Sequence, residues 1–156
     1  MPNTVAIIRI RGYAHASWRI QETLELLRLP KVFNAMIYPY TDSLRGMLIK
    51  VEPYVTWGEI TEEGLNALLN RLETSSGEKI TEEYVKTKLS MDLATFRTKI
   101  LSGELLLNKF DDEFELPIRL HPPSGGFKGK INTPYKAKGV FGYRGSDINN
   151  LIKRMV

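Results

Sequence analysis

Basic and aromatic side chains alternate along two stretches of the chain. The longer stretch, residues 121–145, is HPPSGGFKGKINTPYKAKGVFGYRG, and the shorter one, residues 11–19, is RGYAHASWR. Lysine and arginine neutralise phosphates and exposed rings stack on bases, so this combination predicts RNA binding. On charge and position the candidate contacts are Arg11, His15, Arg19, Lys128, Lys130, Lys136, Lys138 and Arg144.

Several of the residues in and near these stretches also have a structural interpretation. Phe141 and Tyr143 could pack in the core, and for Trp18 core packing and base stacking are equally supported. Arg45, on a short predicted helix, could contact RNA or cap a neighbouring carbonyl group. His121 precedes a Pro-Pro pair, so it could fix a turn or make a contact.

Charge is segregated along the 156 residues. Residues 1–58 carry 7 Lys and Arg against 4 Asp and Glu, and residues 59–115 carry 7 against 13. Residues 116–156 carry 8 against 1. A basic segment of this density is either a solvated surface or a binding surface for a polyanion. The near absence of acidic residues favours the polyanion.

The glycines of SGGFKGKI, residues 124–131, invite comparison with a phosphate-binding P-loop. That motif needs the form G-x-x-x-x-G-K followed by Ser or Thr. Here Gly125 precedes Gly129 and Lys130 by one residue too few, and Ile131 replaces the hydroxyl. The motif is therefore absent. What remains is a flexible loop whose backbone N–H groups and lysines suit a phosphate backbone.

The sequence contains few residues that could catalyse a reaction or bind a metal. There is no cysteine, the only histidines are His15 and His121, and no serine lies in a G-x-S-x-G motif. Two histidines with scattered carboxylates make a weak metal site. We therefore expect no enzymatic activity, no cofactor and no metal. The paired acids Glu62–Glu63 and Glu82–Glu83 suit helix starts, where the helix dipole favours negative charge.

The first third of the chain predicts alternating strands and helices. Residues 4–11 are rich in β-branched residues, with Ile8 and Ile10 alternating with Arg9 and Arg11. The remaining elements are a helix at 18–29 after Ser17, a strand at 32–38, a short helix at 43–51 that Asp42 caps and that contains Gly46, and a strand at 54–60. This β-α-β-α-β order favours an α/β layer with helices on one face of a sheet.

The rest of the chain predicts an acidic helical insertion and a closing segment. Three helices start after Thr61, Thr81 and Asp92, and Gly103 ends the third. An edge strand containing Pro117 follows at 116–120, and a helix capped by Ser146 or Asp147 closes the chain with Ile148, Leu151, Ile152 and Met155 on one face. We expect one domain, residues 1–156, made of a core (1–60), an insertion (61–115) and a basic loop with a closing helix (116–156).

Nothing in the sequence predicts a membrane span or an N-terminal signal peptide. The lack of cysteine fits a cytosolic address. A membrane partner and a small-molecule substrate are therefore not expected.

Two motifs carry a resemblance to a known family. These are TDSLRGMLIKV at residues 41–51 and IRLHPPSGGFKG at residues 118–129. With them the whole chain resembles the L30 family of large-ribosomal-subunit proteins, in its long archaeal form, which is related to the eukaryotic L7 protein. Residues 5–60 correspond to the short bacterial version.

The resemblance implies a ferredoxin-like core and a structural role in the cytoplasmic ribosome. It further implies binding to large-subunit ribosomal RNA, contact with 5S ribosomal RNA, and neighbouring ribosomal proteins as partners. RNA contact carries over to the residues inside the matching motifs, which are Arg45, Arg119, His121, Gly125 and Gly126. The four lysines of the basic loop rest on charge alone.

A second class of function stays open, a small ferredoxin-like module that binds a regulatory ligand. Such a module needs a concave pocket with convergent polar groups, which the sequence does not assemble. It would also leave the basic closing segment unexplained.

Overall fold

The computed structural model describes residues 4–74, 77–104, 106 and 114–156. Its main sheet has five strands in the order β6-β2-β1-β3-β7. They are β6 (Ile118–Arg119), β2 (Asn34–Pro39), β1 (Thr4–Arg9), β3 (Val55–Glu59) and β7 (Gly142–Tyr143). All neighbouring pairs are antiparallel except β3 with β7, which run parallel. The predicted mixed α/β class with a β-α-β-α-β core is confirmed.

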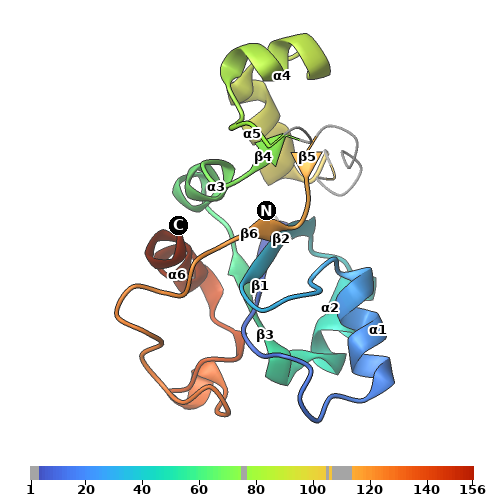
Figure 1. The fold of residues 1–156 in the computed structure, drawn as a ribbon, viewed down its shortest axis with the longest axis vertical. Helices are drawn as coiled ribbons and strands as arrows, with labels where there is room; N and C mark the ends of the chain where they lie inside the picture. The colour runs from blue at the N-terminus through green and yellow to red at the C-terminus, as the bar shows by residue number, and fades with distance from the viewer. Residues whose placement is uncertain (1–3, 75–76, 105, 107–113) are drawn as a thin grey trace.

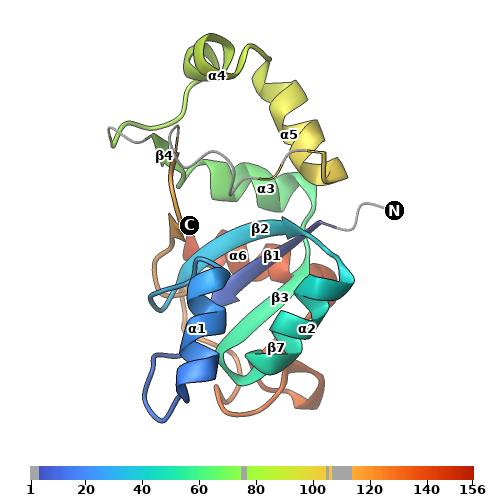
Figure 2. The ribbon, with the colours of Figure 1, turned by 90° about the vertical axis from the view of Figure 1, so that its right-hand side faces the viewer.

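Helices cover both faces of this sheet, whereas the sequence predicted cover on one face (Figure 2). Helices α1 (Trp18–Leu26) and α2 (Asp42–Lys50) pack over Val5 and Ile7 of β1. Helices α3 (Glu62–Leu69) and α6 (Ile148–Met155) contribute to the core that contains Ala6 and Ile8. Successive strand residues point to opposite faces, so an apolar central strand needs cover on both sides.

Helix starts follow the capping residues that the sequence predicted, with one shift. Ser17 and Thr61 each accept a hydrogen bond from a backbone N–H of the first turn, and Thr81 does the same for α4 (Glu82–Leu89). Helix α2 is capped by Thr41, which accepts from the Leu44 N–H at 3.1 Å, and not by Asp42 as predicted. Asp42 is the first helical residue instead, where its charge complements the dipole.

The insertion extends from the sheet toward one end of the molecule (Figure 1). It contains α3, α4 and α5 (Leu93–Ser102), which ends at Gly103 with φ +83° as predicted. A small antiparallel pair, β4 (Glu73–Thr74) with β5 (Phe114–Glu115), was not predicted, because two residues show no periodicity. The Thr4 hydroxyl donates to the Leu101 carbonyl at 2.8 Å, which ties α5 to β1.

The closing helix α6 docks on the core with the apolar face that the sequence predicted. Its Asn149 is also buried, and its side chain joins three parts of the chain. Its Oδ1 accepts from the Thr61 N–H at 2.9 Å, and its Nδ2 donates to the carbonyls of Glu59 at 3.1 Å and Ser146 at 2.9 Å. The predicted edge strand is present as β6, at one margin of the sheet.

Arg9 occupies an unexpected position. Its alternation with Ile8 and Ile10 would place it on a polar face, yet it is only 1% exposed. Its Nε donates to the Arg11 carbonyl and its Nη1 to the Leu29 carbonyl, both at 2.8 Å. The guanidinium also lies 4.0 Å from the centre of the Tyr13 ring. A buried guanidinium is stable only with such partners, so Arg9 has a structural role.

Among the described helices, none has the length and apolar character to span a membrane.

Candidate nucleic-acid interface

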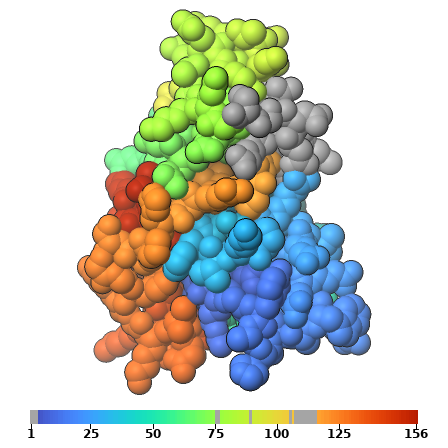
Figure 3. Space-filling view, in the orientation of Figure 1, coloured from blue at the N-terminus to red at the C-terminus, as the bar shows by residue number. Residues whose placement is uncertain are grey.

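The basic loop, defined here as residues 121–141, lies at the end of the molecule opposite α4 (Figure 1). In the space-filling view it forms a broad surface beside the N-terminal part of the chain, while the insertion occupies the far end (Figure 3). The segregation of charge along the sequence is therefore also a segregation in space. A loop with four lysines and no acidic residue attracts and orients a polyanion.

The closing helix holds the part of the basic loop that contains the adjacent glycines Gly125 and Gly126. Gly125 and Gly126 have φ of +79° and +72°, a conformation that favours glycine. The Arg154 side chain donates to the Ser124 carbonyl from Nε at 3.1 Å and Nη2 at 3.0 Å, and Nη2 also donates to the Gly126 carbonyl. The Ser124 N–H donates back to the Arg154 carbonyl at 2.9 Å. Sequence analysis missed Arg154, because the contact joins positions 30 residues apart.

His121 and Arg119 lie where the chain leaves β6 for the basic loop. Both are exposed, and the backbone N–H of His121 donates to the carbonyl of Met155 at 2.9 Å. The closing helix therefore fixes the path of the loop at His121 as well as at Ser124. The His121 side chain is exposed, and the hydrogen bond to Met155 holds its backbone in place.

The four predicted lysines are all exposed, and two of them, Lys136 and Lys138, lie within a closed turn. The Val140 N–H donates to the Thr133 carbonyl at 2.7 Å, and the Tyr135 N–H donates to the Phe141 carbonyl at 2.8 Å. A Cβ atom at Gly129 would lie 2.7 Å from the Lys138 carbonyl oxygen, so the two sides of the turn are in close contact. The second half of the basic loop is thus ordered on the sheet, whereas the sequence predicted one long loop.

Arg144 uses its guanidinium inside the chain. Its Nε donates to the Thr56 hydroxyl at 2.8 Å and its Nη2 to the Val140 carbonyl at 2.7 Å. The guanidinium lies 4.7 Å from the centre of the Tyr135 ring. Burial lowers the pKa of Arg144 from its ordinary value. This geometry makes Arg144 a residue that fastens the turn to β3, and RNA contact by it stays a prediction.

The turn between β1 and α1 presents a second set of candidates. Trp18 is 68% exposed, which excludes the core interpretation. The Arg19 guanidinium lies 5.4 Å from its ring centre, so both side chains are at the surface. His15 is exposed with φ +60°, whereas Arg11 is half-buried and lies 5.3 Å from the Tyr54 ring centre. Trp18 and Arg19 can therefore meet a ligand directly.

Helix α2 exposes its backbone beside Arg45. Gly46 and Arg45 are both exposed, and a Cβ atom at Gly46 would meet nothing within 4 Å. The fold does not require a glycine here, because a larger side chain would meet no neighbour. A glycine inside a helix also lowers its stability relative to alanine. A glycine in an exposed helix does allow another molecule to approach the backbone closely.

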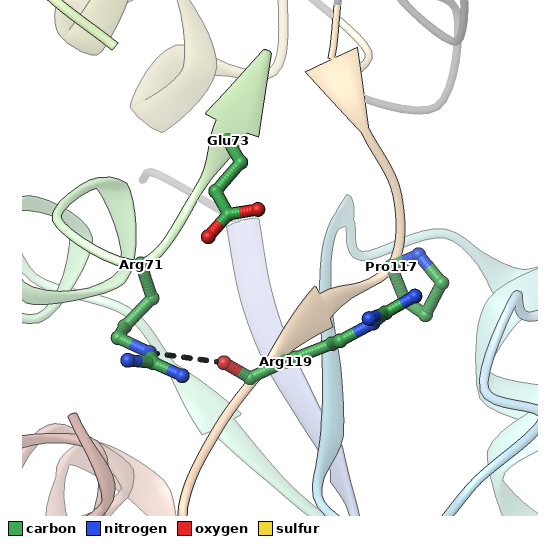
Figure 4. Close-up of a pocket in the computed structure, with 4 residues that line it drawn as sticks. All are labelled: Arg71, Glu73, Pro117 and Arg119. Carbon is green, nitrogen blue, oxygen red and sulfur yellow. Dashed lines mark hydrogen bonds between the residues drawn. The ribbon is translucent and has the colours of Figure 1, made fainter. Parts of the chain in front are cut away.

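A polar hollow of about 210 Å³ separates the insertion from β6 (Figure 4). It is lined by Arg71, Glu73, Pro117 and Arg119, and the Arg71 Nε donates to the Arg119 carbonyl at 3.1 Å. The Arg119 side chain extends toward Pro117 and away from Glu73 (Figure 4), so its guanidinium lies apart from the carboxylate. Arg71 was not predicted as a site residue, because it belongs to the acidic part of the sequence.

Metal chemistry has no support in the parts of the chain that the structure describes, where no three His, Asp or Glu side chains gather at metal-binding distance.

Comparison with known proteins decides the family. A family model described as "Ribosomal protein L30p/L7e" matches residues 5–55. The "Large ribosomal subunit protein uL30" of Sulfurisphaera tokodaii is 59% identical over 158 residues, and that of Sulfolobus acidocaldarius is 56% identical over 156 residues; in both cases the match covers both chains in full. The chain belongs to the L30p/L7e family. A third relative with the same name, from Saccharolobus islandicus, is 52% identical over 158 residues, again in full.

Membership of the L30p/L7e family confirms the resemblance seen in the sequence. The family consists of structural ribosomal proteins, so the prediction of no enzymatic activity is confirmed as well. The family model covers Arg11, His15, Arg19 and Arg45 but ends at Val55. The basic loop lies outside that model, yet the full-length archaeal L30p/L7e relatives span it.

Proposed function

We propose that the chain is a structural protein of the large ribosomal subunit that binds ribosomal RNA through its basic loop. The observation that carries the proposal is the placement of four exposed lysines on a loop held at both ends by the folded core. These are Lys128, Lys130, Lys136 and Lys138. Family membership and the names of the full-length archaeal relatives support the ribosomal role.

Neutralisation of phosphates supplies most of the affinity in this proposal. Each lysine that meets a phosphate releases counterions, which makes binding weaker as salt rises. Such contacts fix position and orientation on the RNA without reading its sequence. The backbone at Gly125 and Gly126 adds a surface without side chains, along which a phosphate chain can lie closely.

The hydrogen bonds that hold the basic loop on the core reduce the conformational entropy that the loop loses when it binds RNA. Arg154 holds Ser124 and Gly126, and Arg144 fastens the later turn to Thr56 of β3. A loop that is already ordered loses less freedom when it binds. The two arginines are therefore positioning residues, and the lysines are the contacts.

The β1–α1 turn and helix α2 extend the proposed interface. Exposed Trp18 can stack on an unpaired base, and Arg19 beside it can meet a phosphate. Arg45 lies next to the open backbone of Gly46. Trp18, Arg19, Arg45 and Gly46 are all exposed, and the packing of the fold does not require these residue types at their positions.

Finer points belong to the same proposal. We infer that the three parts of the chain form one domain, which the hydrogen bonds of Asn149 to Thr61 and Glu59 support. We infer also that the protein contacts 5S ribosomal RNA and neighbouring ribosomal proteins. Its place of work is the ribosome, which in archaea is cytoplasmic.

The test is the salt dependence of binding to deproteinised large-subunit ribosomal RNA. In one variant all four loop lysines become glutamine. In the matched control, Lys79, Lys86, Lys88 and Lys99 of the insertion become glutamine. The loop variant should lower the slope of log K against log salt by about 0.7–0.9 for each phosphate that is no longer neutralised. The control should keep the wild-type slope.

Equal slopes for the loop variant and the wild type would remove the basic loop from the interface. A parallel titration with 5S ribosomal RNA tests the finer proposal separately. Sedimentation of cell extract through sucrose at moderate and high salt tests the ribosomal role. Comigration with the large subunit after the high-salt wash is expected, whereas recovery only at the top of the gradient at moderate salt would contradict it.

A further inference from the structure

A second hollow lies at the end of β3, on the sheet face that α1 and α2 cover. It has a volume of about 270 Å³ and is lined by Val5, Tyr40, Trp57, Glu59 and Tyr143. Strand register brings these residues together. Trp57 and Glu59 are two positions apart on β3 and so share a face, Val5 pairs with Glu59, and Tyr143 pairs with Trp57.

Three aromatic rings form most of the wall. Tyr40 and Tyr143 are 38% and 52% exposed, whereas Trp57 is 7% exposed and supplies the inner side. The ring centres of Trp57 and Tyr143 are 6.5 Å apart at an angle of 50°. Rings that meet at such an angle leave a concave space between their faces.

One carboxylate completes the hollow. The Tyr143 hydroxyl donates to Glu59 Oε1 at 2.5 Å, which holds the carboxylate in place. This bond raises the pKa of Tyr143 to about 12. A carboxylate has two acceptor oxygens, and this bond uses one of them. Among the residues that are described, no lysine or arginine lines the hollow.

We propose that this hollow binds one arginine or lysine side chain from a basic segment of a neighbouring protein. Aromatic faces attract a cation through the ring quadrupole, and aromatic cages recognise quaternary ammonium groups by the same interaction. Glu59 supplies the opposite charge. The partner is a protein, so the site is separate from the proposed RNA interface and does not depend on it.

The charge of the hollow disfavours other occupants. An apolar side chain would cover the aromatic wall but would take the second Glu59 oxygen, which the Tyr143 hydroxyl does not bond, out of water without an opposite charge. An RNA base could stack on the rings, yet its phosphate would approach the same negative charge. Glu52 lines an adjoining hollow that shares Tyr143, and it adds a second negative charge nearby.

The experiment uses nuclear magnetic resonance of the full chain and two tripeptide probes. The probes are acetyl-Gly-Arg-Gly-amide and the same peptide with neutral citrulline in place of arginine. The chain has two tryptophans, so the indole N–H signal of Trp57 reports the hollow and that of Trp18 is an internal reference. The arginine peptide should shift the Trp57 signal in a saturable way, and the citrulline peptide should not.

Two variants and one matched control complete the design. Glu59→Gln removes the charge and should abolish the saturable shift. Tyr143→Phe keeps the ring but loses the bond to Glu59, and it should weaken binding several-fold. Glu22→Gln, an equal change of charge on exposed α1, should bind the arginine peptide as the wild type does. A wild-type pattern of the other amide signals shows that each variant is folded.

The proposal is overturned if citrulline shifts Trp57 as strongly as arginine, or if Glu59→Gln binds normally. A Trp57 shift with adenosine monophosphate but not with the arginine peptide would assign the hollow to a base instead. No saturable shift up to the solubility limit of the arginine peptide would also overturn it. RNA binding by Glu59→Gln should equal that of the wild type, so the outcomes of the two proposals are separate.

Discussion

Arg154 and Ser124 bond each other in both directions across the closing helix and the basic loop. The guanidinium donates to the Ser124 carbonyl from Nε and Nη2, and the Ser124 N–H donates back to the Arg154 carbonyl at 2.9 Å. The final turn of α6 therefore sets the shape of the loop. A side chain near the end of the sequence positions the surface that we propose meets RNA.

The first prediction separates the shape of this loop from its charge. Arg154→Lys keeps the positive charge but cannot place two donors on one carbonyl as a planar guanidinium does. We expect weaker binding to ribosomal RNA, by about 1 kcal/mol, the usual net value of a hydrogen bond. The salt slope should stay at the wild-type value. A filter-binding titration over several salt concentrations measures both, and a changed slope would make Arg154 a phosphate contact instead.

The second prediction concerns the open backbone of α2. Gly46→Ala should raise the free energy of unfolding by about 0.5–1 kcal/mol, because alanine favours a helix and meets no neighbour here. It should at the same time weaken RNA binding if the RNA approaches that backbone. Urea unfolding and the binding titration measure the two effects. Greater stability with unchanged affinity would place α2 outside the interface.

Gly58→Ala provides the contrast to this substitution. A Cβ atom at Gly58 on β3 would overlap the carbonyl oxygen of Gly145, which is backbone and cannot move aside easily. This variant should be destabilised in the same urea experiment. If Gly46→Ala raises the free energy of unfolding and Gly58→Ala lowers it, the space around each glycine decides the effect of the substitution.

The third prediction concerns hydrogen exchange in the free protein. The sequence predicts fast exchange across residues 122–145. The structure narrows this expectation, because the N–H groups of Val140 and Arg144 donate to the carbonyls of Thr133 and Trp57. Amides 128–132 should exchange fast, and those of Val140 and Arg144 should be protected. Fast exchange at Arg144 would mean that β7 is not stably paired with β3.

The fourth prediction tests the packing of α1 on the sheet. Leu24 is fully buried and Leu26 is 67% exposed on the same helix. Leu24→Ala should lower the free energy of unfolding by about 2–5 kcal/mol, since it leaves a cavity in the core. Leu26→Ala should have little effect. Similar urea midpoints for the two variants would refute the assigned face.

Local patterns in the sequence were enough to predict most helices, strands and their order. Ser17, Thr61 and Thr81 cap helices as predicted, and the predicted face of α6 with Ile148, Leu151, Ile152 and Met155 is buried. Capping and helical periodicity act between residues three or four positions apart, so a single sequence contains them. The exposed lysines were predictable for a related reason, since residues 116–156 contain a single acidic residue and so almost no carboxylate that could pair with a buried lysine.

Tertiary structure alone decided what each arginine does. Arg9 is buried, Arg144 fastens a turn to β3 and Arg154 holds a glycine loop, while Arg19 lies at the surface. All four are the same residue type, so composition and spacing cannot tell them apart. Their roles depend on carbonyl groups and rings that folding brings beside them from distant parts of the chain. The aromatic hollow at Glu59 has the same origin, because strand register places its residues together.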